Sequence, residues 1–132
     1  MALAFVTGTS SGIGLATAVA LARAGHTVVA TMCDLDRGAE IRQIATDEKL
    51  AIHLVAIDVD NDESVRHGFP KITSERGPID VLVNNAGVGG GGAIEETSLD
   101  TFRQVMETNF FGGLRCIKAV VPDMRKRRSG TI

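Results

Sequence analysis

One stretch, Thr7-Gly8-Thr9-Ser10-Ser11-Gly12-Ile13-Gly14, decides the fold of this chain. It follows the apolar run 3–6 and opens a helical pattern over 15–24. A strand that turns through glycines into a helix brings unpaired backbone N–H groups and the positive end of the helix to one point, where a pyrophosphate can sit. The stretch therefore predicts a nucleotide-binding turn.

Each glycine of this turn has its own physical role. Gly8 permits a tight turn, Gly12 lets the backbone approach phosphate oxygens, and Gly14 allows the helix to pack closely against the sheet. The backbone of Ile13 belongs to the same cradle, and hydroxyl donors are expected from Thr9, Ser10 and Ser11. The alternative is a glycine-rich turn that binds nothing, which the flanking strand and helix disfavour.

The rest of the chain alternates short apolar runs with helical patterns. Strands are predicted over 3–7, 27–31, 52–57 and 81–84, and helices over 11–24, 37–48 and 62–75. Apolar strands joined by crossover helices are typical of a parallel sheet that is buried on both faces. We therefore predict an α/β fold, a doubly wound parallel sheet with strand order 3-2-1-4, whose ligand lies between the first and fourth strands.

Proline and glycine disturb this pattern at two places. Pro70 falls inside the third predicted helix, where proline costs about 3 kcal/mol, so we expect a break or kink there. Four consecutive glycines at 89–92 are either a flexible linker or a loop beside a substrate mouth. The third helix is expected to start after Asp60, and a last helical region is expected to start near Thr97. Each start has an acidic residue three positions later, Glu63 and Asp100, which is the spacing of a capping box.

The spacing of the turn and three later motifs carry a family resemblance. The turn reads Thr-Gly-x-x-x-Gly-x-Gly, and it is followed in order by Asp58-Val59, Asn84-Asn85-Ala86-Gly87 and Asn109. Together they resemble the short-chain dehydrogenase/reductase family, and in particular its hydroxysteroid and retinol dehydrogenase-like members. The resemblance implies that residues 1–132 are the N-terminal part of a single NAD(P)-binding Rossmann domain.

The resemblance also implies roles for the later motifs. The Asp58 carboxylate would accept from the adenine amino group, and Val59 would line the ring. Asn85 would satisfy backbone groups of the neighbouring loop, Ala86 would belong to the same cofactor-binding segment, and Gly87 would let the chain pass close to the ribose. Asn109 would support a water that leads to the catalytic lysine, through a local distortion of its helix. The open alternatives are a capping or solvated Asp58, an ordinary strand-ending turn at 85–87, and an asparagine tolerated at a helix junction.

The family's catalytic residues are not in this sequence. That family uses a serine and a Tyr-x-x-x-Lys pair beyond a fifth strand, and the chain contains no tyrosine. We therefore expect the N-terminal half of an NAD(P)-dependent oxidoreductase, with the C-terminal strands missing and no activity alone. The complete enzyme would interconvert a secondary alcohol and a ketone by hydride transfer. The alternative is a non-catalytic nucleotide-binding or regulatory module.

The end of the second strand bears on which cofactor is used. An NAD site carries an acidic side chain there for the ribose 2′-hydroxyl, whereas an NADP site carries an arginine for the 2′-phosphate. Met32 stands at the acidic position, and Cys33, followed by Asp34, stands where the resemblance places the arginine of NADP-using relatives. Because Arg37 could reach back to the phosphate, the sequence favours NADP over NAD without deciding between them.

Composition excludes several other function classes. The net charge of −2 and the aromatic content of 4% give no reason to expect a nucleic-acid partner. Two cysteines in no metal-ligand spacing predict a reducing, cytoplasmic location and no metal site. No apolar run is long enough for a membrane span.

The final helix is expected to carry the contacts with other molecules. Its apolar residues should pack on the sheet and on a subunit of a homo-oligomer: Phe110, Phe111, Leu114, Ile117 and Val121. The fourth strand should expose an unpaired edge. The basic run 125–128 suits a solvated helix end, where cations complement the helix dipole.

Overall fold

Four parallel strands form one sheet at the centre of the molecule. The computed structural model describes residues 1–132, and the sheet has the order β3-β2-β1-β4 that the sequence predicts. The strands are short and lie within one residue of their expected bounds: β1 Leu3–Thr7, β2 Thr27–Met32, β3 Ile52–Ala56 and β4 Val81–Val83. All three pairings are parallel, with Leu3 opposite Thr27 and Phe5 opposite Leu82.

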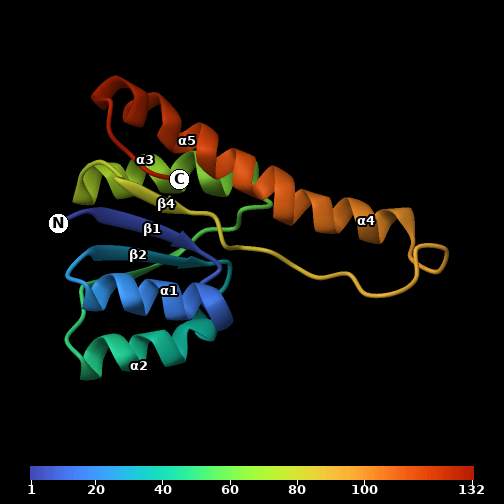
Figure 1. Ribbon diagram of the computed structural model, residues 1–132, viewed down its shortest axis with the longest axis horizontal. Helices are drawn as coiled ribbons and strands as arrows, with labels where there is room; N and C mark the ends of the chain where they lie inside the picture. Colours follow the sequence, from blue (N-terminus) through green and yellow to red (C-terminus); the bar gives the residue numbers. More distant parts are fainter.

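Helices cover both faces of the sheet (Figure 1), so the predicted doubly wound architecture is confirmed. On one face lie α1 and α2, and on the other α3 and α5. The α-helices are α1 Gly12–Arg23, α2 Ala39–Asp47, α3 Asp62–Arg76, α4 Leu99–Met106 and α5 Gly113–Arg127. A single 3₁₀ turn, η1 (Leu35–Gly38), precedes α2, and a π-helical segment, η2 (Glu107–Gly112), joins α4 to α5.

Alternating side chains of β1 divide the core into two clusters. Ala4 and Val6 pack with α1 and α2, whereas Leu3 and Phe5 pack with α3 and α5. Phe5 is fully buried and stacks on Phe69 of α3 with ring centroids 4.3 Å apart. Since successive side chains of a strand point to opposite faces, β1 is buried on both sides and ends in the glycine turn.

The expected break at Pro70 is wrong, because α3 runs without interruption to Arg76. Pro70 is exposed, and so is Arg66, whose carbonyl would otherwise accept from an N–H at position 70. The neighbouring Gly68 has a packing role, since a Cβ there would lie 2.6 Å from the Ile57 side chain. Pro70 thus lies on the solvent-exposed face of α3, and Gly68 lies on the face that packs against Ile57.

The helix starts differ slightly from their predicted positions. Asn61, not Asp60, caps α3, and its side chain accepts from the Ser64 amide at 3.0 Å. Ser98, not Thr97, caps α4 and accepts from the Thr101 amide at 3.1 Å. In both cases a better-placed cap residue stands one position later.

The end of the chain departs most from expectation. The buried face of α5 consists of Cys116, Val120 and Met124, whereas Phe110 and Phe111 are half exposed. The prediction that these two phenylalanines pack on the sheet is therefore wrong. Figure 1 shows α4 projecting away from the body of the molecule, and none of its residues is buried.

The outer edge of β4 is partly covered, contrary to the prediction of a free edge. Thr131 pairs with Val81 in a parallel bridge, its amide donates to the Asp80 carbonyl, and its carbonyl accepts from Leu82. No helix of the structure combines the length and the apolar composition needed to cross a membrane.

Candidate functional site

The site begins where β1 and β4 end side by side. The Thr7 hydroxyl accepts from the Asn85 amide at 3.0 Å and from the Ala86 amide at 2.9 Å. The Asn85 side chain donates at 3.0 Å to the carbonyls of both Thr7 and Gly8. These bonds join two segments 78 residues apart in sequence, and they fix the glycine turn against the segment that follows β4.

Gly8 and Gly14 interlock within this arrangement. Gly8 has a φ of +68°, and a Cβ there would lie 2.8 Å from the Ala86 Cα atom. A Cβ on Gly14 would lie far inside van der Waals distance of the Gly8 carbonyl and of the Asn85 side chain. The predicted close packing at Gly14 is therefore against the turn itself rather than against the strands.

The first turn of α1 offers free amide groups. Ser11 is the N-cap residue but its side chain makes no capping hydrogen bond, and the first turn holds no acidic residue. The amides of Gly12, Ile13 and Gly14 donate to no acceptor in the chain. Gly12, with a φ of +59°, has no atom within 4 Å of its Cβ position. Free donors at the positive end of a helix form an anion site.

Thr9 lies outside this cradle. It is fully buried, and both its amide and its hydroxyl donate to the Thr31 carbonyl, at 3.0 and 3.1 Å. The structure therefore does not provide the predicted hydroxyl donor at this position. Thr9 instead ties the turn to the end of β2.

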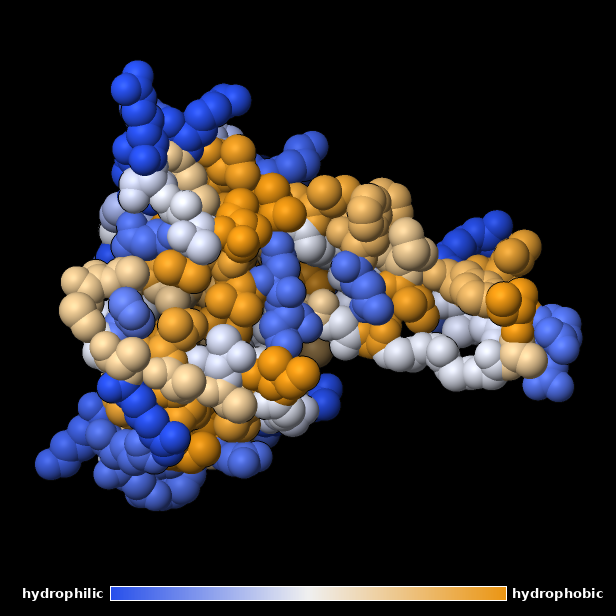
Figure 2. Space-filling view, viewed as in Figure 1, coloured by the Kyte–Doolittle hydropathy of each residue, from blue (hydrophilic) through white to orange (hydrophobic).

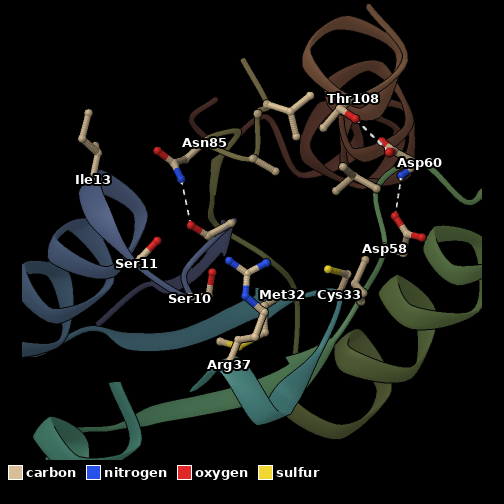
Figure 3. A pocket seen from close by; sticks show the side chains of 16 residues that line it. Ser10, Ser11, Ile13, Met32, Cys33, Arg37, Asp58, Asp60, Asn85 and Thr108 are labelled. Atoms are coloured by element: carbon tan, nitrogen blue, oxygen red, sulfur yellow. Dashed lines mark hydrogen bonds between the residues drawn. The ribbon is translucent and has the colours of Figure 1, made fainter. Parts of the chain in front are cut away.

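A cavity of about 500 Å³ opens in front of the turn. Figure 3 shows its walls, which come from the carboxyl ends of all four strands and from η2. Eleven of the fifteen residues named from sequence line it: Gly8, Ser10, Ser11, Ile13, Met32, Cys33, Asp58, Val59, Asn85, Ala86 and Gly87. Thr9, Gly12, Gly14 and Asn109 do not line it.

Asp58, Val59 and Asp60 form the wall at the end of β3. The Asp58 carboxylate accepts from the Asp60 amide at 3.0 Å, so it closes a local turn while still facing the cavity. Val59 is buried against η2, where a Cβ on Gly112 would lie 2.8 Å from its side chain. The Thr108 hydroxyl donates to the Asp60 carboxylate at 2.8 Å.

Arg115 holds this wall to the helices. Its guanidinium donates to the Val59 carbonyl at 3.1 Å and forms ion pairs with Asp62 and Glu107. Hydrogen bonds to Asp62 and then to Glu107 raise the pKa of Arg115 above its ordinary value. One side chain thus links the β3–α3 connection, η2 and α5.

Asn109 holds the loop after β4. Its side-chain oxygen accepts from the Val88 amide at 2.7 Å, and its side-chain nitrogen donates to the Val88 carbonyl at 2.9 Å. The helix around it is π-helical over Glu107–Gly112, so the expected local distortion is present. The Asn109 amide is therefore committed to the backbone at Val88, beside the cavity.

The end of β2 forms the floor of the cavity, next to the 3₁₀ turn η1. Met32 is buried, Cys33 is exposed, and Arg37 of η1 reaches the same cavity. The Asp34 carboxylate caps η1 by accepting from the Asp36 amide at 2.9 Å, and it does not line the cavity. No carboxylate from β2 or the residues just after it faces this floor.

Sequence reasoning missed some residues of the cavity wall. Ile57, Asp60, Val88 and Thr108 also line it. Ile57 and Asp60 flank a predicted pair and could have been included by proximity. Thr108 gave no signal, because its place depends on how η2 packs over the end of β3.

Comparison with known proteins finds the same family by sequence profile and by individual relatives. A family profile described as short chain dehydrogenase matches residues 2–132. Uncharacterized oxidoreductase YusZ of Bacillus subtilis (strain 168) is 42% identical over 132 residues, covering 98% of this chain and 46% of that protein. Retinol dehydrogenase 8 of Bos taurus is 46% identical over 132 residues, covering 96% of this chain and 41% of that protein.

Solved structures share the fold over nearly the whole chain. The alcohol dehydrogenase from the archaeon Thermococcus sibiricus, complexed with 5-hydroxy-NADP, superposes with a TM-score of 0.89 and 32% identity, covering 99% of this chain and 56% of that one. The chain thus spans about half of that structure, and less than half of the two relatives above.

Proposed function

This chain belongs to the short-chain dehydrogenase family, and from that premise we propose that it holds NAD or NADP as the cofactor-binding part of an oxidoreductase. The reaction would interconvert a secondary alcohol and a ketone. The observation that carries the proposal is the cavity at the β1/β4 junction, which combines free amides at the α1 N-terminus with walls from β3 and β4. Relatives solved with NADP or NADPH support the choice of cofactor class.

The cavity fits a dinucleotide in its chemistry. The free amides of Gly12, Ile13 and Gly14, with the Ser10 and Ser11 hydroxyls beside them, would hold the pyrophosphate. Asp58 and Val59 would hold the adenine, and residues 85–87 would line the ribose on the nicotinamide side. The bound nicotinamide would supply or accept the hydride.

Asn109 would act by holding the backbone at Val88 in place. Its paired hydrogen bonds to Val88 fix the loop that follows residues 85–87. A displaced loop would move the wall beside the nicotinamide, and positioning of this kind has large effects on hydride transfer. We propose this supporting role for Asn109 in place of direct contact with a reacting atom.

Proton transfer to the substrate oxygen needs a donor with a suitable pKa near that oxygen. This chain contains no tyrosine, so the family's Ser and Tyr-x-x-x-Lys would have to come from sequence outside these 132 residues. Relatives named retinol dehydrogenase 8 and 3-ketodihydrosphingosine reductase support a lipophilic alcohol or ketone as substrate. A non-catalytic nucleotide-binding module would share the cavity but would give no turnover under any cofactor.

We propose a cytoplasmic location from the state of the cysteines. Cys33 and Cys116 are both free thiols, one exposed and one buried. Burial raises the pKa of the Cys116 thiol to about 11, which keeps it protonated and unreactive at neutral pH. Free thiols are usual in reducing compartments.

The proposal is tested by Ile13→Glu. Ile13 is 79% exposed and lines the cavity in the first turn of α1. A carboxylate there should weaken NADP and NAD binding roughly 10-fold or more, because repulsion between nearby charges at a protein surface is worth about 1 to 4 kcal/mol. Calorimetry measures the affinity. Thermal stability should not fall, since an acidic residue in a first turn favours the helix.

Ile94→Glu is the matched control, since Ile94 is 82% exposed and lies outside the cavity. It should leave the affinity for both dinucleotides unchanged. If the protein binds neither NAD nor NADP before any substitution, or if both variants bind them equally well, the proposed site is wrong.

We also propose that the protein is a homo-oligomer. The supporting feature is an apolar stripe, defined as Leu99, Phe102, Met106, Phe110 and Leu114, whose side chains are 37% to 69% exposed. Its spacing of three or four residues keeps it on one side of the α4–η2–α5 rod. Figure 2 shows hydrophobic residues continuing from the body of the molecule toward this projecting end. Exposed apolar surface of this extent is typical of an interface.

Met106→Glu should therefore weaken self-association by about tenfold or more, because a charge would be buried without a partner. Sedimentation equilibrium measures the dissociation constant. Gln104→Glu is the control, since it adds the same charge to α4 outside the stripe. A protein that is monomeric at all concentrations, or a control that dissociates as readily as Met106→Glu, would contradict the proposal.

A further inference from the structure

The cavity wall at residues 58–60 lies between two elements and belongs to neither. β3 ends before it and α3 begins after it. Side chains supply much of what holds its backbone: the Asp58 amide donates to the Ser64 hydroxyl at 2.9 Å, and the Asp60 amide donates to the Asp58 carboxylate at 3.0 Å (Figure 3). The shape of this wall therefore depends on where a few side chains are placed.

The carbonyl in the middle of the wall depends on one distant side chain. The Arg115 guanidinium donates to the Val59 carbonyl at 3.1 Å, across 56 residues of sequence. No backbone amide donates to that carbonyl. Because Val59 is buried, loss of the guanidinium would leave its carbonyl without a partner and free to turn.

Two carboxylates fix the Arg115 guanidinium in its orientation. Asp62 is the first residue of α3, Glu107 is the first residue of η2, and Arg115 forms an ion pair with each. The Arg115 side chain is only 21% exposed. A planar guanidinium that is held at several donors keeps one geometry, so its bond to Val59 is a fixed contact.

The same arrangement occurs a second time, away from the cavity. Arg127 donates to the Ile79 carbonyl at 2.9 Å and forms ion pairs with Asp80 and Asp123, and its side chain is 26% exposed. None of these residues lines the cavity. The chain thus offers two arginines with equivalent bonds, of which only Arg115 holds a wall of the candidate site.

From these observations we infer that Arg115 is a positioning residue for the dinucleotide, which sets the wall that receives the adenosine half of the ligand by holding the Val59 carbonyl. The inference rests on the proposed dinucleotide site. Arg115 does not itself line the cavity, whereas Val59 does, so its effect passes through the backbone at 58–60. A wall that is held in place before binding improves affinity for the group that contacts it.

The test compares two ligands, ADP and inorganic pyrophosphate, by calorimetry on the purified protein. Both carry the group expected at the α1 N-terminus, and only ADP carries adenosine. Arg115→Met should weaken ADP binding about 10-fold, the lower end of what a hydrogen bond to a charged group is worth, and leave pyrophosphate binding within about twofold. A smaller fraction of folded protein would weaken both ligands alike, so the ratio of the two affinities is the decisive quantity.

Arg115→Lys separates the hydrogen bonds from the charge. It keeps the positive charge, but a single ammonium cannot hold both carboxylates and the Val59 carbonyl in the geometry of a guanidinium. ADP binding should therefore weaken about threefold or more, again with little change for pyrophosphate. This variant decides the question if Arg115→Met does not fold.

Arg127→Met is the matched control for a purely structural role. It removes the same kind of bonds from the other end of α5, so it should lower the thermal unfolding midpoint as Arg115→Met does. It should leave the ADP-to-pyrophosphate affinity ratio unchanged, because no wall of the cavity depends on it.

The outcomes separate the inference from the proposed function. An unchanged ratio in the folded Arg115 variants overturns the inference and leaves the dinucleotide site standing. Equal weakening of both ligands also overturns it, as does a shift of the same size in Arg127→Met, because Arg115 would then support the fold in general. Absence of binding to ADP, NAD and NADP in the unsubstituted protein contradicts the proposed function itself.

Discussion

Gly14→Ala is expected to abolish saturable NADP binding and to lower the free energy of unfolding by about 3 kcal/mol, at the upper end of what overpacking costs. The added Cβ would collide with the Gly8 carbonyl and with the Asn85 side chain. Neither can move alone, because the Asn85 side chain holds the carbonyls of Thr7 and Gly8 at 3.0 Å. Urea unfolding and calorimetry measure the two effects.

Gly91→Ala is the matched control. No atom lies within 4 Å of a Cβ at Gly91, and its backbone does not require a positive φ. The control should stay within about 0.5 kcal/mol of the unsubstituted protein, as surface substitutions usually do. A Gly14→Ala protein that binds NADP with unchanged affinity would mean that the turn can open without loss of the site.

Phe5→Ala is expected to destabilise the protein by about 3 to 5 kcal/mol. Phe5 is fully buried in the middle of β1 and stacks on Phe69, so its removal leaves a cavity between the sheet and α3. Since β1 leads directly into the glycine turn, the denaturant midpoint measured in the presence of NADP should fall as well. Denaturant titration with and without NADP measures both quantities.

Phe111→Ala removes the same side chain from a position that is 46% exposed. Its cost should stay below about 1 kcal/mol, because little apolar surface is returned to water. Equal losses in the two variants would show that Phe5 does not occupy the core position described above.

The sheet could be predicted from sequence because its signals are local. Each strand is a short apolar run bounded by polar or glycine residues, and the order β3-β2-β1-β4 is the usual one for a doubly wound sheet whose first strand leads into a glycine turn. The end of α1 has an equally local cause, because Gly25, which follows the predicted helix, has a φ of +90°. Information carried by neighbouring residues was sufficient for these elements.

Features that depend on tertiary packing could not be predicted in the same way. Proline propensity indicates a break at Pro70, but which face of α3 meets water decides whether the helix tolerates it. The hydroxyl of Thr9 could have faced the ligand, and only the position of the Thr31 carbonyl shows that it does not. The exposure of Phe110 and Phe111 follows from how far α4 extends beyond the sheet.

The residues of the candidate site also fall into those marked by local sequence and those placed by tertiary packing. Its glycines and the residues after β3 and β4 are marked by spacing, so they were named from sequence. Thr108 and Arg115 were not, because they reach the wall from helices far along the chain. Arg37 was noticed for its charge, but the absence of an acidic partner became visible only in the structure.

The contact between Gly8, Gly14 and Asn85 also bears on how such sequences can diverge. Three segments of the chain occupy one small volume there, and a Cβ at either glycine would intrude on the others. A larger residue at one of these positions can be tolerated during evolution only if the other segments have already moved apart. Such a movement would open the anion cradle. These positions are therefore expected to vary as one inherited unit, while Gly12, which has open space around it, is constrained only by its positive φ and by its ligand.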